Sequence, residues 1–320
     1  MAAARAPSVP DTLADSWTAA GGDGLESRVY GWRANSGDRP AVIWGHANGF
    51  AAGAYEPMLS ELAAEVDVFA YDLRAHGGSG DPGSDFEGDY DRAMSADRLG
   101  LDLFAVVQSI RRRTPTQPLH FAGHSISGLG ALRMGAVFDH APFRSMTLFE
   151  PPLAPTPDVI LHGPAAQLGE FLSNRALRRR REVADPDAFA ASLAERGAFS
   201  RWRADMLKAY ADATLIETAD GWRLRCPPEA EAAGYRTTMD TSTFRALATF
   251  DRPILFVESD PTMDGVAPSW ATKAQGVAAA QAPKGRLERI PGTSHMMPFE
   301  RPDAVMEIVM SQVGVSDHGK

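Results

Sequence analysis

Short apolar runs that alternate with helical patterns limit most strongly how this chain can fold. Five runs of four to six residues end in turns rich in glycine or charge, at 41–44 (AVIW), 66–71 (VDVFAY), 119–122 (LHFA), 145–149 (SMTLF) and 253–257 (PILFV). A weaker sixth run covers 286–290, and helical patterns such as 55–64 and 93–113 fill the gaps. Runs of this length are typical of parallel strands buried on both faces. The alternation predicts an α/β fold with a mostly parallel sheet covered by helices on both sides.

The interval 152–250 breaks this rhythm. It opens with PPLAPTPD, lacks a convincing buried strand and carries helical stretches at 187–195 and 204–213. About a hundred residues are too many for a loop inside a compact domain. We therefore expect a core domain from 1–151 and 251–320, interrupted by a helical cap at 152–250.

Composition narrows the possible partners and compartments. The 32 Lys and Arg residues against 41 Asp and Glu give a net charge of -9, which repels phosphate backbones and disfavours nucleic acid. The single cysteine, Cys226, can form neither an internal disulfide nor a cysteine-based zinc site. No apolar run matches a signal peptide or a membrane span. We expect a cytoplasmic monomer or homodimer that binds a small molecule, with no membrane partner.

The segment GHSISG at 123–128 follows a predicted strand and precedes a predicted helix at 129–137. It is close to the G-x-S-x-G pattern, in which a sharp strand-to-helix turn exposes a serine above the sheet. Ser127 replaces the last glycine, but serine is also small and Gly128 follows directly. Ser125 is therefore the predicted nucleophile, and Ser127 is expected to face helix packing. The competing interpretation is a glycine-rich turn without chemistry.

A serine hydroxyl needs a base within hydrogen-bond reach, and the base needs an acid that orients it. His295 lies in the loop after the last predicted strand and is the predicted base. Two carboxylates compete for the acid. Asp260 follows the run ending at Val257, whereas Glu150 ends the strand before the interruption. We favour Asp260 because it precedes His295 by one strand–helix unit, and we keep Glu150 as the alternative.

Other titratable residues in these turns are expected to shape, pack beside or cap them rather than to react. They are His46, His76, His124, Glu258 and Asp264.

Together these segments resemble the α/β-hydrolase superfamily from about residue 27 to about residue 310. The likeness rests on HANGF at 46–50, DLRAHGGSG at 72–80, GHSISG at 123–128 and GTSHMMPFERPD at 292–303. The resemblance implies an eight-strand sheet whose first, antiparallel strands lie at 16–20 and 27–32. It also implies that the interval 152–250 forms a lid over the serine.

The resemblance further implies an oxyanion hole made of two main-chain amides. One belongs to the residue after the nucleophile, Ile126. The other comes from the turn after the third strand, where Asn48 is the matching position and Gly49 the fallback.

These residues predict a serine hydrolase that needs no cofactor or metal. It would cleave an ester, thioester or lactone bond of a small, largely apolar substrate through an acyl-enzyme intermediate. The alternatives are hydrolytic carbon–carbon cleavage by the same three residues, and a non-catalytic small-molecule-binding protein on the same fold. Large side chains of the cap are expected to line an apolar pocket: Trp202, Met206, Tyr210, Trp222 and Phe244.

Overall fold

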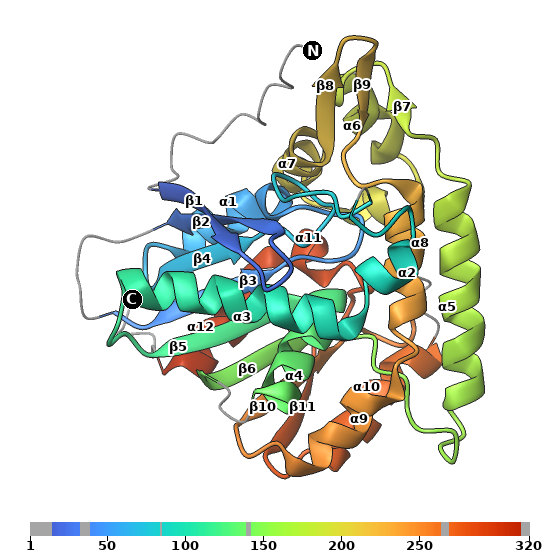
Figure 1. Ribbon diagram of the computed structural model, residues 1–320. Helices are drawn as coiled ribbons and strands as arrows, with labels where there is room; N and C mark the ends of the chain where they lie inside the picture. The colour runs from blue at the N-terminus through green and yellow to red at the C-terminus, as the bar shows by residue number, and fades with distance from the viewer. Residues whose placement is uncertain (1–14, 33–38, 84, 139–141, 264–268, 315–320) are drawn as a thin grey trace.

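An eight-stranded sheet forms the centre of the computed structural model, which describes residues 15–32, 39–83, 85–138, 142–263 and 269–314 (Figure 1). The strand order is β1-β2-β4-β3-β5-β6-β10-β11. Strand β2 pairs antiparallel with β1 and β4, and all other pairs are parallel. The predicted α/β-hydrolase sheet is thereby confirmed. Its strands are β1 (Asp15–Ala20), β2 (Glu26–Trp32), β3 (Ala41–Gly45), β4 (Asp67–Tyr71), β5 (Leu119–His124), β6 (Phe143–Phe149), β10 (Ile254–Glu258) and β11 (Gly285–Arg289).

Helices cover both faces of the sheet because the central strands are apolar on both sides. In β3, Ile43 belongs to one buried cluster, whereas Val42 and Trp44 belong to the other. The first cluster includes side chains of α3 (Ala96–Arg113) and α4 (Ile126–Val137), which lie in front of the sheet in Figure 1. The remaining core helices are η1 (Ala52–Tyr55), α1 (Glu56–Leu62), α2 (Tyr90–Ala93), α10 (Ser269–Gln281), α11 (Met297–Glu300) and α12 (Pro302–Val313).

The chain between β6 and β10, here called the cap, is only partly helical. Its helices are α5 (His162–Leu177), α6 (Pro186–Ala194), η2 (Gly197–Arg201), α7 (Ala204–Thr214), α8 (Pro228–Thr237), α9 (Thr241–Ala246) and η3 (Leu247–Thr249). A three-stranded antiparallel sheet accompanies them, formed by β7 (Glu182–Val183), β8 (Leu215–Thr218) and β9 (Gly221–Leu224). These strands were not expected from the sequence because they are too short to produce a periodic pattern.

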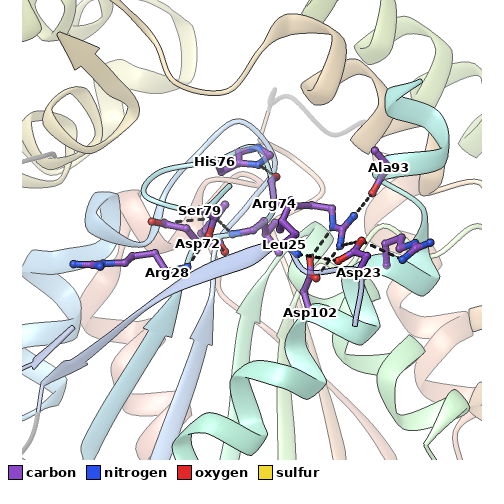
Figure 2. Close-up of polar contacts among 12 residues, drawn as sticks. Asp23, Leu25, Arg28, Asp72, Arg74, His76, Ser79, Ala93 and Asp102 are labelled. Carbon is purple, nitrogen blue, oxygen red and sulfur yellow. Dashed lines mark hydrogen bonds and ion pairs between the residues drawn. The ribbon is translucent and has the colours of Figure 1, made fainter. Parts of the chain in front are cut away.

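A buried ion pair holds the turn after β4, shown in Figure 2. Arg74 is fully buried, and its Nε lies 2.7 Å from Asp102 Oδ2 in α3. Its other nitrogens donate to Asp23 Oδ2 (3.1 Å) and to the carbonyl oxygen of Ala93 (2.8 Å). A buried charge is tolerated when its hydrogen bonds are satisfied in this way. The ordered turn presents His76 to the loop after β3.

Candidate active site

Ser125 occupies the sharp turn between β5 and α4. Its backbone has φ 57° and ψ -126°, a conformation that residues other than glycine rarely adopt. The turn packs so tightly that a Cβ on Gly45 would lie 2.4 Å from Ser127 Cβ, and one on Gly123 would lie 2.8 Å from Ser127 Oγ. Ser127 is fully buried and donates to the carbonyl oxygen of His124 (3.0 Å). Of the two serines, only Ser125 lines the central cavity.

His295 is hydrogen-bonded to Glu150, the residue directly after β6. The imidazole Nδ1 donates to Glu150 Oε2 at 2.7 Å, and Glu150 Oε1 accepts from the amide and hydroxyl of Ser259 (2.8 and 2.5 Å). Burial raises the pKa of the Glu150 carboxyl, but the hydrogen bonds from His295 and Ser259 outweigh burial and leave the pKa below its ordinary value. The carboxylate is therefore ionised beside the imidazole.

The structure does not bring Asp260 to His295, which corrects our preferred acid. Asp260 Oδ2 accepts from the amide of Gly292 (2.9 Å), and Oδ1 accepts from the amide and hydroxyl of Thr262 (2.9 and 2.7 Å). These hydrogen bonds, that of the Thr262 hydroxyl foremost, lower the pKa of Asp260 to about 2. Glu150 takes the place beside His295 although both carboxylates follow parallel strands that end at the same sheet edge. Asp260 instead closes a turn.

The other titratable residues of these turns have mainly structural contacts. Glu258 forms an ion pair with Arg289, and His46 Nε2 accepts from the amide of Leu73 (2.9 Å). Asp264 lies outside the described residues.

Two residues that line the cavity with Ser125 have main-chain N–H groups available for an oxyanion. Ile126 is the first residue of α4, where amides have no partner within the helix. In the described part of the chain, the amides of Ile126 and Asn48 have no hydrogen-bond acceptor, and both residues line the cavity. The amide of Gly49, our fallback, instead donates to His76 Nε2 at 2.9 Å. The structure thus favours Asn48 over Gly49 as a partner for Ile126.

The cavity has an empty volume of about 930 Å³, including the part open to solvent. Two helices of the cap supply much of its apolar wall. Their lining residues are Ala165, Leu168, Gly169 and Leu172 in α5, and Gly234, Tyr235, Thr238 and Met239 at the end of α8 and just after it. The four residues of α5 follow the helical i, i+3, i+4, i+7 spacing. Any helix packed against a core shows the same spacing, so the sequence alone does not distinguish a cavity wall from core packing.

None of the five cap side chains that we expected in this pocket lines it. Trp202 instead stacks on Phe299 with ring centroids 4.2 Å apart, and Met206 is fully buried in the core cluster beneath α7. Trp222 pairs with Val183 in the small cap sheet. Trp202 and Met206 belong to a buried cluster that also contains Phe299 of the core, so their apolar character reflects packing rather than cavity lining.

A sequence model described as the alpha/beta hydrolase family matches residues 10–308. The chain belongs to this family. A 3-oxoadipate enol-lactonase of Acinetobacter baylyi (strain ATCC 33305 / BD413 / ADP1) is 28% identical over 109 residues, which cover 34% of this chain and 36% of that protein. The match thus spans about a third of the enol-lactonase.

Solved structures share the fold of this alpha/beta hydrolase. An E-2-(acetamidomethylene)succinate hydrolase superposes with a TM-score of 0.73 and 18% identity, covering 94% of this chain and 99% of that one. The enol-lactonase of Burkholderia xenovorans LB400 superposes with a TM-score of 0.64 and 17% identity, covering 93% and 100%. At these identities the likeness shows the fold alone.

The cap of this alpha/beta hydrolase is bonded to the loop that carries His295. Glu300 accepts from the amide and hydroxyl of Ser294 (2.6 and 2.8 Å) and from Arg201 Nε in η2 (2.9 Å). On the other side of the cavity, Asn48 Nδ2 donates to the carbonyl oxygen of Glu231 in α8 (2.7 Å). The cap thus contacts both the loop of His295 and the loop of Asn48.

Two features are absent from the described residues. No helix there is long and apolar enough to cross a membrane. No group of three or more His, Cys, Asp or Glu residues there is arranged to hold a metal ion.

Proposed function

We propose that this alpha/beta hydrolase cleaves an ester, thioester or lactone bond of a small, uncharged and largely apolar substrate. The observation that carries the proposal is the His295–Glu150 hydrogen bond beside a cavity that Ser125 also lines. A hydroxyl, an imidazole and an ionised, buried carboxylate together form the set that activates a serine nucleophile.

In the proposed mechanism, Ser125 Oγ attacks the carbonyl carbon while its proton passes to His295 Nε2. The charge that develops on the carbonyl oxygen is stabilised by the amides of Asn48 and Ile126, each worth about 3 kcal/mol in comparable sites. Glu150 stabilises the imidazolium, which then protonates the departing oxygen or sulfur. Water, deprotonated by His295, releases the acyl group from Ser125 and regenerates the hydroxyl.

The charges around the cavity support an uncharged substrate. Its described lining residues include no Lys or Arg, and its only carboxylate, Glu150, is bonded to His295. A substrate carboxylate would lose its hydration there without gaining a cationic partner, at a cost of several kcal/mol. The names of the enol-lactonase and the succinate hydrolase denote substrates derived from dicarboxylic acids. We infer that the substrate of this chain differs from theirs in charge.

The test uses a fluorophosphonate, which labels only activated serines. Wild type is expected to be labelled, Ser125→Ala is expected to remain unlabelled, and Ser127→Ala serves as the control that removes the neighbouring hydroxyl. Labelling that persists in Ser125→Ala would remove Ser125 as the nucleophile. Absence of labelling in wild type would favour a binding protein without turnover.

A further inference from the structure

His124 and Tyr55 lie between the three segments of the proposed active site. His124 ends β5 and directly precedes Ser125, whereas Tyr55 ends η1, which follows the loop of Asn48. Both side chains are fully buried. The proposed mechanism uses neither of them, so the polar atoms of this pair need another explanation.

A continuous chain of hydrogen bonds runs through the two side chains. The amide of Ala47 donates to Tyr55 Oη (3.2 Å), and Tyr55 Oη lies 2.8 Å from His124 Nδ1. On the other side of the ring, His124 Nε2 lies 2.8 Å from the carbonyl oxygen of His295. This chain of hydrogen bonds therefore begins at the amide one residue before Asn48 and ends at the carbonyl oxygen of His295, the proposed base.

The partners determine where each proton lies. A carbonyl oxygen only accepts, so His124 Nε2 carries the hydrogen and donates to His295. In the neutral ring, Nδ1 is then an acceptor for the Tyr55 hydroxyl, whose oxygen in turn accepts from Ala47. Burial lowers the pKa of His124 well below its ordinary value, and the nearby His295 lowers it further, which keeps the ring neutral. One tautomer satisfies every group in the chain.

We propose that His124 and Tyr55 are positioning residues that hold the Asn48 loop and His295 in register with Ser125. The inference rests on the proposed function, because register matters only if these three segments act on one reacting carbonyl. A misplacement of about 1 Å can lower the rate about a hundredfold when reacting groups must be aligned. The hydrogen-bond chain ends on the main chain of Ala47, next to Asn48, and on the main chain of His295. Loss of one of its hydrogen bonds would therefore shift the Asn48 amide or the His295 ring relative to Ser125.

The test compares two tyrosine hydroxyls that are both buried. Tyr55→Phe removes the central link but keeps the ring that packs on Trp44 and Phe299. Tyr71→Phe is the matched control, because the Tyr71 hydroxyl is buried in β4 without a hydrogen-bond partner among the described residues. For a short 4-nitrophenyl ester, we expect Tyr55→Phe to lower kcat about tenfold with KM changed less than twofold. We expect Tyr71→Phe to leave both constants unchanged.

A double-mutant cycle separates positioning from loss of stability. His124→Phe breaks the same chain, so adding Tyr55→Phe to it should cause little further loss of kcat in protein that remains folded by circular dichroism. A Tyr55→Phe variant with the kcat of the Tyr71→Phe control would overturn the positioning role while wild-type labelling upholds the proposed function. If the kcat losses of the two single variants multiply in the double variant, the two residues act independently, and the positioning role would also be overturned. A wild type that neither hydrolyses esters nor reacts with a fluorophosphonate would overturn both proposals.

Discussion

Glu150 accepts a 2.7 Å hydrogen bond from His295 Nδ1 across 145 positions of sequence. Glu150 is the first residue after β6 and therefore stands where the chain leaves the sheet to enter the cap. It has φ 46°, and with Ser125 it is one of four non-glycine residues with positive φ in the described part of the chain. Such strained backbone positions gather at functional sites. Here the proposed nucleophile and the proposed acid share this property.

Replacing the acid tests its assignment. Glu150→Gln keeps the shape but removes the charge that orients and stabilises the imidazolium, so we expect kcat to fall about 10³-fold. Asp260→Asn is the control and should change kcat less than threefold, because Asp260 only closes the turn at Gly292. Steady-state rates on a short 4-nitrophenyl ester measure both effects. A larger loss at Asp260 would return the role to that residue.

Much of this arrangement could be predicted from sequence, but the carboxylate partner of His295 could not. The apolar runs and the GHSISG segment predicted the sheet and the position of Ser125. Asp260 and Glu150 both follow strands that end at the same sheet edge, and one sequence does not reveal which of the two side chains reaches His295. The cavity wall was missed for a similar reason, since Leu168 and Leu172 show the spacing of any packed helix.

The stability of the protein should fall in mild acid. Burial lowers the pKa of His46 to about 4, and burial together with the charge of His46 lowers the pKa of His76 to about 4. In the unfolded chain both titrate near pH 6.5, so between pH 6.5 and 4 the unfolded state binds protons that the folded state does not. The free energy of unfolding therefore decreases as pH falls, by about 1.4 kcal/mol per pH unit for each histidine.

Urea unfolding at several pH values between 7.5 and 5 measures this slope. His46→Gln should reduce the slope by the contribution of one proton, about 1.4 kcal/mol per pH unit. This change is expected whatever the variant does to stability at neutral pH. An unchanged slope in His46→Gln would show that His46 is not held neutral by burial.

The ion pair between Arg179 and Glu231 should support the cap. Arg179 Nη1 donates to Glu231 Oε2 (2.8 Å) and Nη2 donates to Tyr210 Oη (2.6 Å). Arg179→Met leaves the buried Glu231 carboxylate without its cation, so we expect the free energy of unfolding to fall by about 2 kcal/mol. Arg178→Met, at an exposed neighbouring position, should have little effect. Equal stability of the two variants in urea would contradict this role.

Two esters of similar size test the charge of the substrate. Because the described residues that line the cavity include no Lys or Arg, the 4-nitrophenyl ester of butyric acid should be hydrolysed with about a hundredfold higher kcat/KM than the mono-4-nitrophenyl ester of succinic acid. Met239→Lys, which adds a cation to the wall, should narrow this ratio. Similar values for both esters in wild type would contradict the inference of an uncharged substrate.

Direct detection of the acyl-enzyme tests the central claim, that Ser125 is the nucleophile. Wild type is mixed with a short 4-nitrophenyl ester, quenched in acid within the first turnovers and analysed by mass spectrometry of the intact chain and of its peptides. We predict a mass increase of one acyl group, located on Ser125 and absent from Ser125→Ala. An acyl group on another residue, or hydrolysis by Ser125→Ala at the wild-type rate, would contradict the account.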